Sequence, residues 1–136
     1  MKLRSAAVTM ALTSGFALAA CGSDDKSSGA STDKPTPAVA LAEIPQVKAG
    51  LDKAVKQVES GDSAAAEDTV SNTYVDHFEK VEDPLGEVDP ELKEQLEDGI
   101  NAELRKEISD GAPAAQISKH VDQLKADLDT AAEKLK

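Results

Sequence analysis

The chain has little cysteine, methionine or aromatic character, and each shortage removes a class of function. Its single cysteine, Cys21, excludes an intrachain disulfide and a cysteine-based zinc site. Tryptophan is absent, and only Tyr74 and Phe78 follow Cys21 as aromatic residues, which is a poor endowment for binding sugars or flat ligands. Both methionines, Met1 and Met10, precede Cys21, so the part that follows cannot form a methionine-rich copper site.

Basic residues are also scarce. The chain has 15 Lys and Arg against 26 Asp and Glu, and Lys2 and Arg4 are two of the 15. Beyond this start, 13 basic residues face 26 acidic ones, which gives a net charge of −13. Nucleic acids and anionic lipid surfaces are bound through basic patches, so neither is a suitable partner. The balance favours cations, cationic partners or simple solubility.

Residues 1–20 predict a secretory signal peptide. Lys2 and Arg4 form a positively charged start, and residues 6–20 are apolar or small with no acidic residue. This run is too short and too weakly apolar for a membrane-spanning helix. No stretch after Cys21 approaches the roughly 20 apolar residues that a span needs.

The end of this segment, Leu-Ala-Ala-Cys at residues 18–21, resembles the lipobox of bacterial lipoproteins. In that family the thiol of the cysteine receives a diacylglyceryl group, and the cysteine becomes the mature N-terminus. The resemblance implies an extracytoplasmic protein anchored to the cell membrane through lipid on Cys21. The alternative is an ordinary cleaved secretory protein with an incidental cysteine.

The remaining chain divides into a tether and one domain. Residues 22–37 are rich in Ser, Gly, Asp, Thr and Pro and lack apolar periodicity, so we expect a disordered tether over residues 21–37. Residues 38–136 are long enough for a single domain.

Apolar residues in this domain recur every three or four positions along four stretches, which predicts four amphipathic helices. Their apolar positions are Ile44, Val47, Leu51, Val55 and Val58; Val70, Tyr74, Phe78, Val81 and Leu85; Leu92, Leu96, Ile100, Leu104 and Ile108; and Ile117, Val121, Leu124, Leu128, Ala131 and Leu135. No stretch alternates with the period of two that is typical of strands. The sequence therefore predicts an all-α fold, an up-down-up-down four-helix bundle.

Turn and cap residues set the expected helix boundaries. The first helix should end near Gly61, and Asp62 or Ser63 should cap the second. The sequence Asp-Pro-Leu-Gly at residues 83–86 is expected to break the second helix. Asp89 with Pro90 should open the third. Gly111 should close that helix, and Pro113 should lie in the first turn of the fourth.

Carboxylates border the aromatic positions of the second helix. Glu79 and Glu82 are three residues apart, so their Cβ atoms should lie about 5–6 Å apart on one face, with Asp76 one turn before them. The antiparallel third helix could add Glu94 or Glu97, and carboxylates from facing helices can bind a cation. In so acidic a chain, the alternative is a solvated acidic surface.

The other polar residues suggest structural roles. His77 and His120 are each expected on a helix flank, and Arg105, which shares a face with Glu97 and Asn101, is expected to pair within the domain. No nucleophile can be placed beside a histidine and an acid, and no glycine-rich phosphate loop is present. We therefore expect no enzyme.

The pattern Phe-Glu-x-Val-Glu at residues 78–82, followed by Asp-Pro-Glu-Leu at residues 89–92, resembles the extracytoplasmic helical domain of bacterial FTR1-type iron permeases. The likeness covers residues 61–136. The permeases handle iron through Arg-Glu-x-x-Glu motifs in membrane helices, which are absent here, and Phe78 stands where the arginine would precede Glu79. The resemblance implies a stand-alone, lipid-anchored accessory domain that helps iron or another cation reach a permease or other transporter. It implies Glu79 and Glu82 as metal ligands, with Asp76 and Glu97 next.

Two functions remain open from the sequence. One is a metal-binding or transport-accessory lipoprotein that handles iron as Fe³⁺ or Fe²⁺. The other is an acidic helical scaffold of the cell envelope that binds a cationic partner and no metal.

Overall fold

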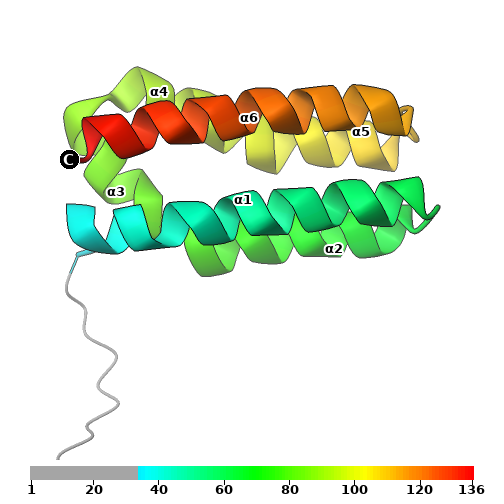
Figure 1. The fold of residues 1–136 in the computed structure, drawn as a ribbon, viewed down its shortest axis with the longest axis horizontal. Coiled ribbons are helices and arrows are strands. Elements are labelled where there is room, and N and C mark those ends of the chain that lie inside the picture. Colours follow the sequence, from blue (N-terminus) through cyan, green and yellow to red (C-terminus); the bar gives the residue numbers. More distant parts are fainter. Residues whose placement is uncertain (1–33) are drawn as a thin grey trace, which may run out of the picture. The chain divides into compact units, whose positions relative to one another are not determined.

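The computed structural model describes residues 34–136, and every regular element in that range is helical. The predicted signal peptide, the lipid-bearing Cys21 and most of the predicted tether lie outside the described residues. Four helical stretches follow one another and correspond to the four predicted helices (Figure 1). The prediction of an all-α fold is therefore confirmed for this part of the chain.

Two of the four stretches are interrupted by π-helical segments, labelled η. The first stretch is α1 (Pro37–Glu59), and the fourth is α6 (Ala114–Lys134). The second consists of α2 (Ser63–Thr73), η1 (Tyr74–Phe78) and α3 (Glu79–Val88). The third consists of α4 (Pro90–Glu97), η2 (Asp98–Leu104) and α5 (Arg105–Ser109).

Most helix ends follow the predicted signals. The Asp62 carboxylate accepts a hydrogen bond from the Ala65 N–H at 3.1 Å and caps α2, and Asp89 caps α4 in the same way. Gly61 and Gly111 follow α1 and α5 with φ of +85° and +73°, a conformation that glycine adopts without strain. Pro113, by contrast, does not lie in the first turn of the fourth helix as predicted, because α6 begins at Ala114 and Pro113 precedes it as the N-cap residue with an extended ψ of 140°.

The prediction that the second helix breaks at residues 83–86 is wrong, because α3 continues through Pro84 to Val88. Pro84 has no N–H to bond the Lys80 carbonyl, which would normally destabilise the helix. Pro84 and Leu85 are both buried, so apolar contacts offset the missing hydrogen bond. In Figure 1, α3 leaves the line of α2 and rises towards α4. Such a change of direction is expected at a proline near a π-helical turn.

The core consists of the predicted apolar positions with few exceptions. Every predicted position of the fourth helix is buried, and so is Phe78. Tyr74, Leu92, Val55 and Val58 are only partly buried and pack against the core from its edge. Tyr74 thus lies at the boundary between the core and the surface, where its hydroxyl can bond the Glu82 carboxylate.

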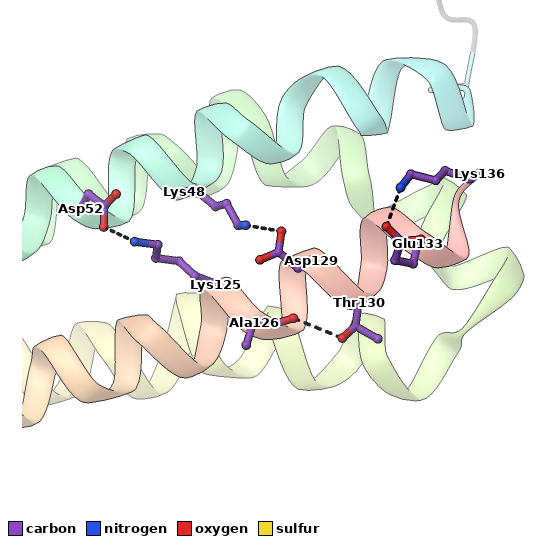
Figure 2. A network of polar contacts seen from close by, with 8 residues as sticks. All are labelled: Lys48, Asp52, Lys125, Ala126, Asp129, Thr130, Glu133 and Lys136. Carbon is purple, nitrogen blue, oxygen red and sulfur yellow. Dashed lines mark hydrogen bonds and ion pairs between the residues drawn. The ribbon is translucent and has the colours of Figure 1, made fainter.

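The first and last helices run antiparallel, as two ion pairs between them show (Figure 2). Lys48 of α1 pairs with Asp129 of α6, and one turn later Asp52 of α1 pairs with Lys125 of α6 at 2.7 Å. The order of the partners reverses between the two helices. The start of α1 therefore lies beside the end of α6.

The same reversal occurs within each half of the domain. Glu43 and Gly50 of α1 lie level with Lys80 and Thr73 in the second stretch. Contacts of 2.9 Å join Asp89 to Lys134 and Gln95 to Asp127, which sets the third stretch antiparallel to α6. Both connections reverse the direction of the chain.

Candidate functional site

Carboxylates gather around Tyr74 where η1, α3 and α4 meet, and we call Tyr74, Glu79, Glu82, Lys93 and Glu97 the carboxylate cluster. The Tyr74 hydroxyl donates a hydrogen bond to Oε1 of Glu82. Lys93 pairs with Glu97 one turn further along α4. The cluster thus joins the second helical stretch to the third.

The pKa of Glu82 is raised above the usual range of a glutamate. Burial raises its pKa, because a charged carboxylate loses hydration in the half-buried position between the helices. The negative charges of Glu97 and Glu79 raise this pKa further, whereas the hydrogen bond from Tyr74 and the positive charge of Lys93 lower it. Glu82 therefore favours a bound proton or a nearby cation more than a solvated glutamate does.

The pKa values of Tyr74 and Lys93 are also raised. Burial raises the pKa of the Tyr74 phenol, and the hydrogen bond to Glu82 adds to the effect, so Tyr74 remains a neutral donor. The hydrogen bond with Glu97 raises the pKa of Lys93, which keeps its ammonium charged. The Tyr74 ring packs against Phe78 with centroids 5.5 Å apart, which fixes the phenol at the edge of the core.

The structure brings together three of the four acids predicted for a metal site. Glu82 and Glu97 are half-buried, and Glu79 is exposed but close enough to affect the pKa of Tyr74 and Glu82. Asp76 does not belong to the cluster: it is exposed and lines a groove between α1 and the second helical stretch. The π-helical segment that contains Asp76 changes the angular positions of its residues relative to a continuous α-helix.

Lys93 is the member of the cluster that sequence reasoning missed. Its position four residues before Glu97 is the spacing of an ion pair on one helix face, and this signal could have identified it. Within residues 34–136, no three His, Asp or Glu side chains are arranged to hold a metal ion. The Lys93 ammonium pairs with Glu97 and acts on Glu82, so a metal cation bound by these two carboxylates would have to displace it.

The two histidines lie on helix flanks, as predicted, and each faces a carboxylate on another helix. Nδ1 of His77 lies 2.6 Å from Glu43 of α1, and Nδ1 of His120 lies 3.0 Å from Glu107 of α5. Arg105 donates to the Asn101 side chain at 3.1 Å, so its partner within the domain is this amide.

Comparison with models of known protein families, with curated proteins and with solved structures finds no match for this chain. The resemblance to the helical domain of iron permeases therefore stays a prediction. No helix within residues 34–136 combines the length and apolar character needed to cross a membrane.

Proposed function

We propose that the protein is a lipid-anchored extracytoplasmic module that binds a metal cation, iron foremost, and assists its transport. Lipid on Cys21 would hold it at the membrane, with residues 21–37 as the tether. Its partner would be an iron permease or another transporter, as the resemblance implies. We assign it no catalytic role and no nucleic-acid partner.

For the domain at residues 38–136 we propose an up-down-up-down four-helix bundle. The antiparallel ion pairs between α1 and α6 support this topology, as do the reversals at Gly61 and Gly111. Bundles build cation sites from carboxylates on facing helices. The position of the carboxylate cluster between the second and third stretches agrees with that design.

The observation that carries the metal proposal is the gathering of carboxylates around Glu82. The negative charges of Glu97 and Glu79 act on Glu82, and the Tyr74 hydroxyl donates a hydrogen bond to it. Carboxylate oxygens suit hard cations such as Fe³⁺. A metal ion would replace Lys93 as the counter-charge of Glu82 and Glu97, with Glu79 as a further ligand from the rim.

A second function, an acidic scaffold that binds a cationic protein, is favoured by a different observation. Lys93 already pairs with Glu97, so the cluster has a counter-charge without metal. Val75 precedes Asp76 in the sequence and is 53% exposed, which leaves an apolar side chain on the surface that a protein partner could cover.

Calorimetric titration of the purified protein in detergent with chelated Fe³⁺, Fe²⁺, Cu²⁺, Zn²⁺ and Mn²⁺ distinguishes the two functions. We expect stoichiometric binding with a Kd of about 1 μM or tighter, which corresponds to about 8 kcal/mol. The double variant Glu82→Ala with Glu97→Ala should lose this binding, because it removes the two half-buried ligands.

The matched control is Glu59→Ala with Asp68→Ala, which removes two exposed acids elsewhere in the domain. Binding that survives in the control and disappears in the cluster variant supports the metal function. Absence of binding to every cation, or equal loss in both variants, would reject it and favour the scaffold.

A further inference from the structure

A polar groove of about 300 Å³ lies between α1 and the second helical stretch, apart from the carboxylate cluster. Its walls carry Gln46 and Lys53 from α1 and Asn72, Asp76 and His77 from the facing stretch. Its volume lies at the lower end of the range for small-molecule sites, roughly 300–1,000 Å³. The two helices thus form a concave surface with amide, ammonium, carboxylate and imidazole groups.

The groove lies where α1 and the second helical stretch approach closely, at Gly50 and Thr73. A Cβ atom on Gly50 would lie 2.1 Å from the hydroxyl oxygen of Thr73, so only glycine allows this approach of the helices. Thr73 is 5% exposed, and its hydroxyl donates to the Thr69 carbonyl at 2.7 Å. The Thr73 hydroxyl therefore has no free hydrogen to donate to a ligand. A ligand would have to bind the polar side chains along the two walls of the groove.

The antiparallel register places opposite charges at opposite ends of the groove. Gly50 lies level with Thr73, and Glu43 contacts Lys80, so Gln46 lies beside His77. Lys53 lies seven residues beyond Gln46 in α1, which is a distance of about 10 Å along the helix axis at 1.5 Å per residue. One end therefore carries Asp76 and His77, and the other carries the ammonium of Lys53.

The end with Asp76 is suited to an ammonium group. Nδ1 of His77 lies 2.6 Å from the Glu43 carboxylate, so in the neutral ring Nδ1 carries the proton and Nε2 is an acceptor. An ammonium group could donate to Nε2 and to the Asp76 carboxylate, while a carboxylate at the other end could accept from Lys53. The separation exceeds the distance between the two charges of a free amino acid and favours a longer zwitterion.

We propose that this groove binds a small zwitterion of dipeptide length, with its ammonium group at Asp76 and His77 and its carboxylate at Lys53. The ligand would lie along the groove over Gly50, and its amide could bond Gln46 or Asn72. This site is separate from the proposed metal function.

The test is NMR titration of the ¹⁵N-labelled protein in detergent with glycylglycine. Saturable shifts should occur at backbone amides of residues 46–53 and 69–77. N-acetylglycylglycine lacks the ammonium and glycylglycinamide lacks the carboxylate, so both should bind at least fivefold more weakly. Lys53→Gln and Asp76→Asn should each weaken glycylglycine binding by roughly fivefold to tenfold, which corresponds to about 1 kcal/mol.

Lys56→Gln and Asp68→Asn are matched controls, because they remove the same charges from exposed positions outside the groove. Unchanged binding in these controls, with losses in the groove variants, supports the proposal. Non-saturable shifts, shifts confined to other residues, or equal responses to the singly charged analogues would overturn it.

Discussion

At the scale of single residues, the carboxylate cluster is held by competing effects on one carboxyl group. Burial raises the pKa of Glu82, and Glu97 and Glu79 act in the same direction. The folded chain therefore binds this proton more tightly than the unfolded chain does. Its contribution to stability is present at low pH and is lost as the pH rises through the raised pKa.

Glu82→Gln should therefore leave the free energy of unfolding at pH 7 unchanged or higher, since glutamine is neutral and can still accept the Tyr74 hydrogen bond. Relative to this variant, the wild type should gain stability as the pH falls from 7 to the usual glutamate pKa of about 4.3, because Glu82 takes up its proton more readily in the folded chain. Urea unfolding at both pH values measures the difference, with Glu94→Gln as an exposed control. If Glu82→Gln were less stable than the wild type at pH 7, and if this difference did not change with pH, the raised pKa of Glu82 would not be the cause of the effect.

Glu43 shows the opposite effect. The hydrogen bond with His77 lowers its pKa, and the contact with Lys80 acts in the same direction. The folded pKa lies below the unfolded one, so this stabilisation is present above the unfolded pKa, about 4.3 for glutamate, and is lost as the pH falls through the folded value.

Glu43→Gln should lower the free energy of unfolding by about 1 kcal/mol at pH 7, because both cross-helix partners lose a charged acceptor. The difference from wild type should shrink at acid pH. Chemical unfolding across the pH range measures it, and Glu59→Gln, at an exposed position of the same helix, should have no comparable effect. A loss that is constant with pH would show that packing is responsible.

At the scale of elements, α1 and the second helical stretch approach closely at Gly50 and Thr73. Alanine usually stabilises a helix interior relative to glycine by about 1 kcal/mol. At Gly50, however, the added methyl group would overlap the Thr73 side chain, so Gly50→Ala should destabilise the fold by about 2 kcal/mol. Adding Thr73→Ala to the Gly50→Ala variant should recover part of the lost stability.

Gly86→Ala is the control, because its added Cβ meets only the Lys93 side chain at 3.9 Å. We expect this substitution to stabilise α3 by up to about 1 kcal/mol. Thermal unfolding of the three variants tests the pair of expectations. Equal effects at Gly50 and Gly86 would mean that the helices separate without cost at the Gly50 contact.

The spacing of apolar residues explains which elements could be predicted. In the last helix the spacing mixes three and four, which matches 3.6 residues per turn, and all predicted positions are buried. From Leu92 to Ile108 the spacing is four throughout, so a continuous α-helix would rotate the stripe away from the core. The segment η2 takes up this excess. Such a run of fours in a sequence is therefore a signal for a π-helical turn.

The site was less predictable than the helices for two reasons. Helical spacing alone placed Asp76 beside Glu79, and the π-helical segment η1 separated them. The proximity of Glu82 and Glu97 depended on the turn between α3 and α4, where the buried Pro84 was expected to end the helix. Local pattern identified the acids, whereas their grouping depended on tertiary packing.

At the scale of the whole molecule, the proposed anchor depends on one atom, the sulfur of Cys21. Cys21→Ser should move the protein from the membrane fraction to the soluble fraction, because the remaining chain has no stretch of roughly 20 apolar residues after this position. Cell fractionation with detection of the domain measures the change. Membrane retention of the serine variant would contradict the lipoprotein proposal.

The ends of the described chain lie at the same turn. Lys34 pairs with Glu87 at 2.6 Å, and Lys134 pairs with Asp89 at 2.9 Å, so residues near both ends contact acids that flank the junction of α3 and α4. The domain should therefore tolerate circular permutation. A short linker from Lys136 to Lys34, with new termini at Gly61 or Gly111, would preserve all helices, and retained cooperative unfolding would show that the order of the helices along the chain is dispensable for folding.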